Sequence, residues 1–454
     1  MSIQATVARQ RAYFRSGATL PVHRRKKALN DLLRELALRE GALLAALRED
    51  LGKAAFEGYM TEVGLVRDEL RYHLKNLDKW AKDTKHPTPL AQFPGRSWTH
   101  PEPYGVALIM SPWNYPVQLC LIPLIGALSA GNCAVVKPSA YAPATSRAVA
   151  ELISAALPPE LVTVVEGGRE ENQALLEERF DYIFFTGSPD VGRYVMEKAA
   201  RHLTPVTLEL GGKSPCIVTP SANLNLAARR IAFGKLVNAG QTCVAPDYVL
   251  VHESIKDRLA QLIAREVERF LGDDPLANPE YPKIVNEKHF TRLIRLLEGE
   301  TILFGGQARD GRIAPTLVDC ADGSSPVMQE EIFGPILPLL SYHALDEVID
   351  FVQDRPKPLA LYLFTRSKQT EKTILSRLSF GGGCINDTLV HLATHHMPFG
   401  GVGGSGMGGY HGKASFDTFS HTKSILKKGH WPDLTIRYHP YTAGKEKLVR
   451  RVLK

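Results

Sequence analysis

The sequence predicts an α/β protein with two doubly wound domains, and three observations support this prediction. Apolar strand-like segments alternate with helical segments between residues 106 and 210, and a second alternation runs from 215 to about 420. Strands that are apolar on both faces and separated by helices form parallel sheets covered on both sides. The third observation is length, because 454 residues exceed one ordinary core and favour about two to three domains.

The composition excludes several classes of protein. Hydrophobic residues make up 44% of the chain and charged residues 23%, as in folded globular domains. The net charge of +7 is mild, and the basic runs 23–27 and 445–454 contain no aromatic residues, so no nucleic acid partner is expected. Six cysteines without paired spacing predict neither disulfides nor a metal site, and they fit a reduced, cytoplasmic location.

Neither a signal peptide nor a stable membrane anchor is expected. Residues 1–15 lack an apolar core followed by a cleavage site. The stretch between Glu102 and Lys137 has no charged residue and resembles a membrane span in hydropathy. Prolines and asparagines interrupt it, so a buried strand–helix–strand unit is the better interpretation.

The first series of elements follows an N-terminal helical region, which includes the helical segment 22–49, and a strand-like connector at 83–103. Its expected strands are 106–109, 133–136, 162–165, 182–185 and 206–210, and its expected helices are 117–130, 144–156, 172–177 and 191–202. Five strands in this order are sufficient for a dinucleotide-binding domain, in which ligands bind beyond the carboxyl ends of the strands. The informative polar residues lie at those ends: Asn114, Lys137, Ser188 and Glu209.

The second series and the tail complete the expected elements. Strands are expected at 248–251, 302–304, 336–340 and 359–364, helices at 255–270, 288–297 and 345–354, and a strand-like piece at 434–437.

Two glycine-rich strings are rejected as nucleotide motifs. The run 401–406 matches G-x-G-x-x-G, but no helix pattern follows it, and 211–214 resembles the end of a P-loop whose first glycine is replaced by Thr207.

Three residues are candidates for chemistry, each with a purely structural alternative. Cys243 lies between a helical stretch at 224–239 and a strand at 249–251, where the thiol can point into a cleft or be an inert buried group. Glu209 lies in an apolar strand, where a carboxylate is costly unless it is paired or functional. Asn114 lies between prolines, where a simple turn residue is common.

Taken together, seven stretches resemble the NAD(P)-dependent aldehyde dehydrogenase family. They occur in the family's order at compatible separations, and the resemblance covers nearly all of the chain. The stretches are Pro112-Trp113-Asn114, Lys137-Pro138-Ser139, Phe185-Thr186-Gly187-Ser188 with Gly192, Leu208-Glu209-Leu210-Gly211-Gly212-Lys213, Gly240-Gln241-Thr242-Cys243, Glu330-Glu331-Ile332-Phe333-Gly334-Pro335 and Pro398-Phe399-Gly400-Gly401. The resemblance implies an aldehyde dehydrogenase-like fold of two doubly wound α/β domains plus a small β bridging or oligomerisation region.

The resemblance also implies a division into domains. Residues 1–82 and 104–209 are expected to form the dinucleotide-binding domain, and 210–424 the catalytic domain with the nucleophilic cysteine. Residues 83–103 and 425–454 are expected to form the bridging region and tail.

The string 408–413 with Phe416 is similar to the class 3 branch, which is linked to fatty and aromatic aldehydes. That similarity implies a homodimer acting on a small-molecule aldehyde. The tail is basic where membrane-anchored members of the branch carry an apolar segment, so no anchor is expected.

The resemblance assigns a mechanism to the three candidates. The Cys243 thiolate attacks the aldehyde carbonyl and gives a thiohemiacetal. The Asn114 amide and the Cys243 backbone N–H stabilise the oxyanion. Hydride then passes to the nicotinamide, and water activated by Glu209 hydrolyses the thioester to the carboxylic acid. Lys213 is expected to assist near Glu209.

Cofactor and substrate contacts are also implied by the resemblance. Lys137 meets the adenine-side ribose, the turn at 187–192 faces the pyrophosphate, and Glu331 holds the nicotinamide ribose. The cofactor-binding set is Trp113, Lys137, Gly187, Ser188, Gly192, Leu210, Glu331 and Phe333. The expected substrate pocket residues are Tyr115, Thr242 and Phe399.

One departure from the family pattern concerns the choice between NAD and NADP. Many relatives carry an acidic residue three positions after the lysine, and here that position is Ala140. Without that carboxylate the ribose 2′-hydroxyl loses an acceptor, and a 2′-phosphate meets no repelling charge. We therefore expect NADP to be tolerated.

Two alternatives remain open at this stage. A CoA-acylating aldehyde dehydrogenase would not need a water-activating carboxylate, so Glu209 counts against it. A catalytically silent scaffold of the same fold would be free to lose Cys243, Asn114 or Glu209, and all three are present.

Overall fold

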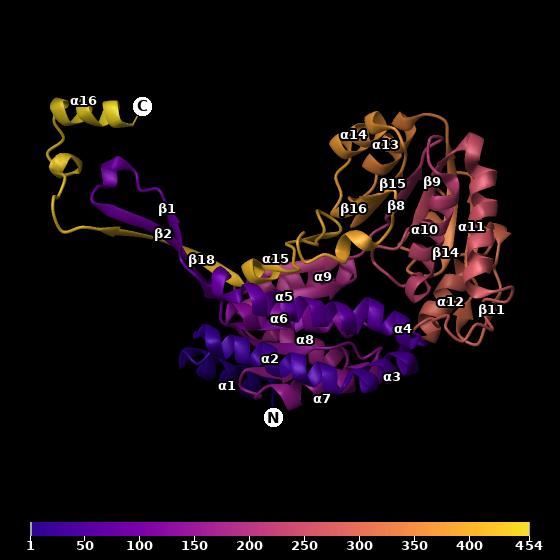
Figure 1. Cartoon of the computed structure of the whole chain (residues 1–454), viewed down its shortest axis with the longest axis horizontal. Coiled ribbons are helices and arrows are strands. Elements are labelled where there is room, and N and C mark those ends of the chain that lie inside the picture. Colours follow the sequence, from indigo (N-terminus) through magenta and orange to yellow (C-terminus); the bar gives the residue numbers. More distant parts are fainter. Residues whose placement is uncertain (1, 454) are drawn as a thin grey trace.

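The computed structural model describes residues 2–453 and shows two α/β bodies with a projecting arm (Figure 1). The chain begins with a helical layer. Its helices are α1 (Ile3–Arg15), α2 (Val22–Leu38), α3 (Glu40–Leu51), α4 (Ala55–Gly58) and α5 (Gly64–Trp80), with a π-helical turn η1 (Tyr59–Val63) before the last. The predicted helical segment 22–49 is two helices, because Arg39 (φ −105°, ψ 9°) leaves the helical conformation.

The first sheet has six strands in the order β17-β7-β6-β3-β4-β5. They are β3 (Val106–Met110), β4 (Cys133–Lys137), β5 (Val162–Val164), β6 (Tyr182–Gly187), β7 (Val206–Leu210) and β17 (Gly406–Met407). The five predicted strands are confirmed and are parallel, whereas the unpredicted β17 is antiparallel to β7. The chain order reverses between β3 and β6, so a ligand site is expected beyond their carboxyl ends.

Helices cover both faces of this sheet. They are α6 (Gln118–Ala130), α7 (Pro143–Ala156), α8 (Arg169–Glu177) and α9 (Pro189–Ala200). Leu108 packs in a core with α1, α8 and α9, whereas its neighbour Ile109 packs in a core with α6 and α7. Alternate residues of β3 therefore serve different cores, which explains the unbroken apolar run. The predicted buried strand–helix–strand unit is confirmed.

The second sheet has seven strands in the order β10-β13-β14-β9-β8-β15-β16. They are β8 (Pro215–Val218), β9 (Tyr248–His252), β10 (Thr301–Phe304), β13 (Thr316–Cys320), β14 (Ile336–Tyr342), β15 (Ala360–Phe364) and β16 (Gly382–Ile385), beside a hairpin of β11 (Ala308–Arg309) and β12 (Arg312–Ile313). Its helices are α10 (Leu224–Leu236), α11 (Lys256–Leu271), α12 (Glu287–Arg295), α13 (Leu345–Gln353) and α14 (Lys368–Arg377), whereas α15 (Lys413–Thr418) packs against α6 of the first body. The four predicted strands are present, and β8, β13 and β16 were not predicted.

The arm is a three-stranded sheet that extends away from both bodies (Figure 1). It contains β1 (Thr84–His86), β2 (Gly95–Pro103) and β18 (Ser420–Lys428), and α16 (Ala443–Val452) follows near the C-terminus. The predicted strand-like piece at 434–437 is wrong, because Thr435–Arg437 is a 3-10 turn. The ladder stops where Lys428 pairs with Gly95 at the start of β2, and Pro432 has no N–H to extend it.

Within residues 2–453, no helix combines the length and the apolar character needed to cross a membrane. The same residues place no three His, Cys, Asp or Glu side chains together as a metal site.

Candidate active site

Cys243 lies in a tight connection between α10 and β9. The helix ends at Leu236, earlier than predicted, because Asn238 (φ 53°) and Ala239 (φ 51°) adopt the left-handed conformation. Each such residue costs about 1–2 kcal/mol, so the surrounding contacts must enforce the turn. Gly240 continues it at φ +73°, and a Cβ there would collide with the carbonyl oxygen of Gly334. The turn that presents the thiol is therefore a specified conformation.

Hydrogen bonds join this turn to Asn114. The Asn238 side-chain amide donates to the carbonyl oxygens of Asn114 (2.8 Å) and Gln241 (3.0 Å). The Asn114 side-chain amide donates to the Gln241 carbonyl oxygen at 3.1 Å. An amide nitrogen carries two protons, so Asn114 keeps one donor for another acceptor. The buried Asn114 amide thus lies beside the cysteine loop.

Two cavities meet at Cys243. The apolar cavity has a volume of about 820 Å³, and its lining includes Met60, Tyr115, Phe233, Thr242, Phe399 and His411. The acidic cavity has a volume of about 800 Å³, and its lining includes Asn114, Gly187, Ser188, Glu209, Glu331 and Phe333. Leu119 and the half-buried Cys243 line both. The thiol therefore has access to two different environments.

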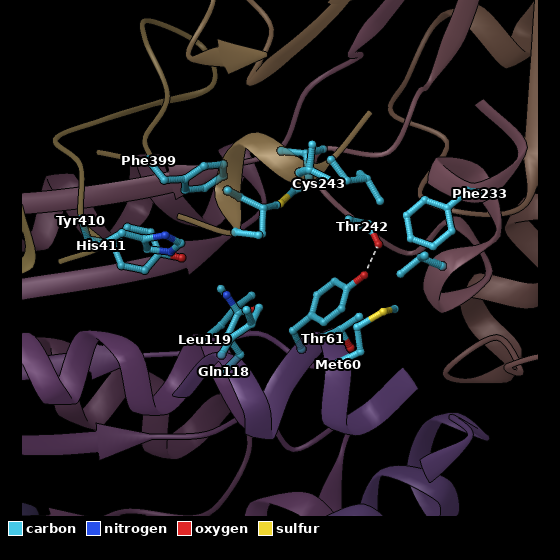
Figure 2. Close-up of a pocket in the computed structure, with 18 residues that line it drawn as sticks. Met60, Thr61, Gln118, Leu119, Phe233, Thr242, Cys243, Phe399, Tyr410 and His411 are labelled. Atoms are coloured by element: carbon cyan, nitrogen blue, oxygen red, sulfur yellow. Dashed lines mark hydrogen bonds between the residues drawn. The ribbon is translucent and has the colours of Figure 1, made fainter. Parts of the chain in front are cut away.

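The apolar cavity lies between the N-terminal helices and the second body (Figure 2). Tyr115, Thr242 and Phe399, the expected substrate residues, all line it. The Tyr115 hydroxyl and Thr242 Oγ1 share a hydrogen bond of 2.5 Å, so neither is left unpaired in the wall.

The sequence interpretation missed several wall residues of the apolar cavity. His411 lies within the string 408–413, so its class 3 resemblance was a usable signal. Gln118 is a polar residue in the charge-free stretch, which was also a usable signal. Met60 and Phe233 come from distant helices and carry no sequence pattern that marks them.

The acidic cavity contains two buried carboxyl groups with unpaired oxygens. Neither Glu209 oxygen has a hydrogen-bond partner in the described chain, and burial raises the Glu209 pKa well above its usual range. Glu331 Oε1 is also unpaired, and burial, reinforced by the Asp247 charge, raises the Glu331 pKa to about 8. Glu331 is therefore largely protonated at neutral pH in the free protein, and burial shifts the Glu209 pKa in the same direction.

The pKa of the Cys243 thiol is also raised. Burial, with smaller contributions from Glu331 and Glu209, raises the pKa of the Cys243 thiol to about 12. The free protein therefore holds a neutral thiol at neutral pH, and a thiolate requires a nearby positive charge or a proton acceptor.

The first sheet and the glycine run 400–408 position Glu209 together. Glu209 lies in β7 between Thr186 of β6 and Gly406 of β17. A Cβ on Gly400 would come within 3.2 Å of Glu209 Oε1, so a glycine there leaves space around the carboxyl group. The run rejected as a nucleotide motif thus forms part of the wall behind Glu209.

The start of α9 fits a dinucleotide pyrophosphate. Ser188 caps this helix by accepting from the Val191 N–H at 3.5 Å. Gly187 has no space for a Cβ beside the Phe185 ring, and a Cβ on Gly192 would lie 2.6 Å from Leu210 Cδ2. These glycines allow α9 to pack closely on the ends of β6 and β7. Gly187 and Ser188 line the acidic cavity, so the N–H groups at the start of α9 favour an anion there.

A third cavity, the Lys137 cavity, continues from the acidic cavity past Trp113. It has a volume of about 1350 Å³, and its lining includes Lys137, Ser139, Ala140, Arg169 and Val191. Lys137 Nζ donates to the carbonyl oxygens of Pro138 (2.7 Å) and Gly167 (2.6 Å), and burial lowers the Lys137 pKa.

Trp113 lines both the acidic and the Lys137 cavities. Its ring packs edge-on against the Phe333 ring, with 5.3 Å between the ring centres. A dinucleotide therefore fits across the two, with the unpaired Glu331 oxygen available to ribose hydroxyls. Arg169 was missed because it lies outside every motif.

Lys213 does not lie beside Glu209 as expected. Its Nζ donates to Asp247 Oδ2 (2.5 Å) and to the carbonyl oxygens of Val327 (3.0 Å) and Glu330 (2.8 Å). These contacts hold the loop that carries Glu331. Asp247, Val327 and Glu330 all belong to the second body, so the lysine ammonium is held there and not at Glu209.

Comparisons with known proteins point to one family. A model of the aldehyde dehydrogenase family matches residues 1–425. The chain is 47% identical over 448 residues to the 4,4'-diaponeurosporen-aldehyde dehydrogenase of Staphylococcus aureus (strain NCTC 8325 / PS 47), covering 98% of this chain and 97% of the relative. It is 47% identical over 441 residues to aldehyde dehydrogenase family 3 member B1 of Bos taurus, covering 96% of this chain and 94% of the relative.

Solved structures agree. A substrate-bound state of Staphylococcus aureus AldH matches with a TM-score of 0.98 and 46% identity, covering 100% of both chains. A GapN glyceraldehyde-3-phosphate dehydrogenase from Methanocaldococcus jannaschii complexed with NADP matches with a TM-score of 0.84 and 25% identity, covering 94% of both chains. An indole-3-acetaldehyde dehydrogenase complexed with NAD+ matches with a TM-score of 0.85 and 27% identity, covering 94% of this chain and 88% of that chain.

Proposed function

The chain belongs to the aldehyde dehydrogenase family and oxidises apolar aldehydes with NAD or NADP, and on this premise we propose that Cys243, Asn114 and Glu209 carry out the chemistry. The observation that supports this assignment is the position of Cys243 between an apolar cavity and a cavity with two unpaired carboxyl groups. The aldehyde chain occupies the first cavity, and its carbonyl reaches the thiol at the boundary.

In the first half of the reaction, Cys243 loses its thiol proton to solvent, and the thiolate Sγ forms a bond to the carbonyl carbon. The carbonyl electron pair moves to oxygen, and the free Asn114 amide proton and the Cys243 backbone N–H donate to this oxyanion. Fixed donors of this kind contribute about a hundred- to a thousandfold in rate. Lys137, Glu331 and the start of α9 would hold NAD(P)+ across the acidic and Lys137 cavities, where the nicotinamide would supply the hydride acceptor. Loss of hydride from carbon re-forms the C=O bond and leaves a thioester on Cys243.

In the second half, water attacks the thioester carbonyl and Glu209 takes a proton from it. The C–S bond breaks, the acid leaves, and Cys243 Sγ regains the sulfur electron pair. Glu209 suits this role because no protein group competes for its oxygens and because a raised pKa makes it a stronger base. A proton acceptor of this strength is the feature that a CoA-acylating enzyme would not require.

We propose a medium- or long-chain aliphatic or aromatic aldehyde as the substrate. Aromatic and aliphatic side chains such as Phe233, Phe399 and Leu119 line the apolar cavity. Burial of apolar surface contributes roughly 25 cal/mol per Å², so such a wall favours long or aromatic chains over short ones. Relatives named as a 4,4'-diaponeurosporen-aldehyde dehydrogenase and as a family 3 aldehyde dehydrogenase support this class.

We propose that NADP is tolerated. Ala140 is exposed in the Lys137 cavity, and Arg169 lines the same cavity with no partner among the described side chains. A 2′-phosphate would therefore meet Lys137 and Arg169 and no carboxylate at position 140. A specificity constant that favours NAD by more than about a hundredfold, roughly 2.7 kcal/mol, would contradict this proposal.

We also propose a cytoplasmic homodimer with the domain division 1–82 with 104–209, 210–424, and 83–103 with 425–454. All six cysteines are free. The arm exposes Phe93 (59% exposed) and Trp431 (84% exposed), which suits a second copy better than solvent. Light scattering in solution tests the dimer, and a monomeric mass would contradict it.

The first experiment measures formation of reduced nicotinamide with a medium-chain and an aromatic aldehyde, using NAD and NADP in parallel. Turnover that disappears in Cys243→Ser supports the assignment. Formation of a CoA thioester, with no acid released, would support the acylating alternative. A folded protein without turnover, whose thiol is still alkylated slowly when NAD or NADP is added, would support the silent scaffold.

A further inference from the structure

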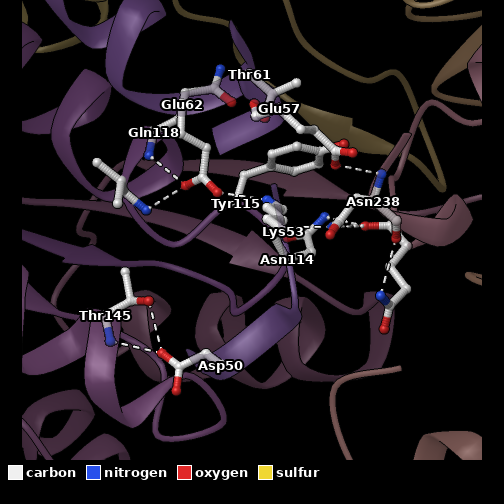
Figure 3. Close-up of polar contacts among 12 residues, drawn as sticks. Asp50, Lys53, Glu57, Thr61, Glu62, Asn114, Tyr115, Gln118, Thr145 and Asn238 are labelled. Carbon is white, nitrogen blue, oxygen red and sulfur yellow. Dashed lines mark hydrogen bonds and ion pairs between the residues drawn. The ribbon is translucent and has the colours of Figure 1, made fainter. Parts of the chain in front are cut away.

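A fully buried ion pair lies directly behind Asn114 (Figure 3). Lys53, just after α3, and Glu62, in the π-helical turn η1, both have side chains that are 0% exposed. Lys53 Nζ donates to Glu62 Oε1 at 2.6 Å and to the backbone carbonyl oxygen of Asn114 at 2.8 Å. The same ammonium lies 4.1 Å from the centre of the Tyr115 ring. The lysine therefore directs its charge at the segment that carries the oxyanion donor.

Glu62 holds the other end of that segment. Its Oε2 accepts from the backbone N–H groups of Val117 (2.8 Å) and Gln118 (3.3 Å), where α6 begins. A helix start has unpaired N–H groups that favour a carboxylate. Lys53 thus binds the segment 114–118 at Asn114, and Glu62 binds it at Val117 and Gln118. The ion pair between Lys53 and Glu62 fixes the distance between these two points of contact.

The turn that carries Cys243 is bound to the same carbonyl oxygen of Asn114. The Asn114 carbonyl oxygen accepts from Asn238 as well as from Lys53, and Glu57 accepts from the Asn238 N–H at 2.8 Å. The Asn114 side chain in turn donates to Gln241, two residues before the nucleophile. Lys53 therefore contacts a backbone group that belongs to the oxyanion donor and that also accepts from the nucleophile turn.

We infer that Lys53 and Glu62 are positioning residues that hold the Asn114 amide at the place where the oxyanion forms. This inference rests on the proposed function, because it presumes that Asn114 is an oxyanion donor. Such a donor acts only within a few tenths of an ångström of its place, and a misplacement of about 1 Å costs roughly a hundredfold in rate. Stability alone does not explain the pair, because well-packed apolar groups replace buried ion pairs at little cost.

The variants must separate positioning from folding. Lys53→Met alone leaves the Glu62 charge buried without a partner, which is strongly destabilising. The double variant Lys53→Met/Glu62→Gln removes both charges and keeps an acceptor oxygen for α6. Asp50→Asn is a matched control near the end of the same helix α3, because Asp50 accepts from the Thr145 N–H (2.7 Å) and Oγ1 (2.7 Å) and does not touch residues 114–118 (Figure 3).

The experiment is a double-mutant cycle read by single-turnover hydride transfer, with thermal stability and cofactor affinity measured on each protein. The double variant is expected to slow hydride transfer by about tenfold to a hundredfold with cofactor affinity unchanged. Asp50→Asn is expected to lower thermal stability with the hydride-transfer rate unchanged. In an Asn114→Ala background, the Lys53/Glu62 substitutions are expected to cause no further loss, because the group that they position is absent.

Three outcomes would overturn the inference. One is a folded double variant with the wild-type hydride-transfer rate. Another is an equal loss in the presence and absence of the Asn114 amide, which would show a general structural role and leave the proposed function standing. The third is wild-type hydride transfer in Asn114→Ala alone, which would overturn the oxyanion role and the inference with it.

Discussion

The apolar and acidic cavities share Leu119 and Cys243 as a common wall. In the first, the Tyr115 hydroxyl and Thr242 Oγ1 are paired with each other and His411 Nε2 has no partner within residues 2–453, but no carboxyl group of these residues lines the cavity. The second leaves the oxygens of Glu209 and one oxygen of Glu331 unpaired. Unpaired buried oxygens are unfavourable in the free protein, so their presence indicates a site whose partners arrive with the reaction.

Substrate binding and proton transfer are therefore separated in space. The apolar cavity can change shape to suit an aldehyde without altering the proton-transfer groups, and the acidic cavity can hold its carboxyls away from the substrate chain. Substitutions in the two cavities should therefore affect different kinetic constants.

The largest effect is expected from Glu209→Gln in the acidic cavity. Loss of a general base should lower kcat by about 10²–10⁴-fold, while a first turnover of reduced nicotinamide remains. In the wild type, thioester hydrolysis should accelerate as pH rises, because more of a carboxyl with a raised pKa becomes ionised. Stopped-flow absorbance at several pH values checks this, with the exposed Glu280→Gln as control. An unchanged steady-state rate would show that another group activates the water.

The next effect extends the comparison to the Lys137 cavity. Ala140→Glu should reduce kcat/KM for NADP by about tenfold to a hundredfold, because a carboxylate there repels a 2′-phosphate. The constant for NAD should stay the same or improve, because the new carboxylate can accept from the 2′-hydroxyl. Parallel initial rates with both cofactors provide the test, and Ala140→Gln separates charge from size. An equal loss with NAD and NADP would indicate a packing effect instead.

A smaller effect is expected from Phe233→Ala in the apolar cavity. Removing one aromatic wall residue should lower kcat/KM for a medium-chain aldehyde by about tenfold, through KM, because roughly 1.5–3 kcal/mol accompanies burial of such a side chain. A two-carbon aldehyde, which cannot reach that wall, is the control substrate and should be little affected. A fall in kcat with both substrates would contradict the separation of binding and chemistry.

The smallest effect concerns stability and is expected from Glu331→Gln. Since burial raises the Glu331 pKa from 4.5 to about 8, the folded protein binds more protons than the unfolded chain between these values. The free energy of unfolding should therefore fall as pH rises across this window and level off above it. Glutamine does not ionise, so the Tm of the variant should exceed that of the wild type by a few degrees at pH above 8. The two should converge below pH 4.5, as thermal unfolding without cofactor can show, and identical pH slopes would exclude a titrating Glu331.

Sequence patterns predicted the sheets better than their edges. The five central strands of the first sheet are apolar on both faces, and that pattern is local. β17 has two residues and only its partner β7 defines it, so no local pattern could mark it. Likewise, 434–437 has strand-like composition, but no neighbouring strand is available there. Pairing partners, unlike propensity, depend on segments far away in the chain.

The motifs predicted which residues gather at the site, because Asn114, Glu209, Cys243 and Glu331 all line the acidic cavity. They did not predict the contacts behind these residues. Lys53 and Glu62 lie among charged helical residues that look like a solvated face, yet both are fully buried. Lys213 lies beside Glu209 in the sequence but points to Asp247. Burial of a charged side chain depends on how helices pack, which spacing along the chain does not reveal.

The pairing of the late strands also sets the order in which the chain can mature during synthesis. β17 completes the edge beside β7, and β18 lies along the whole of β2 in the arm. The ribosome delivers β7 long before these partners, and at about 5–20 residues per second the delay is on the order of tens of seconds. During that interval the nascent chain displays two unpaired strand edges, which are templates for aggregation. A chain truncated before residue 406 would keep those edges permanently, so the last tenth of the protein acts as its protection against self-association.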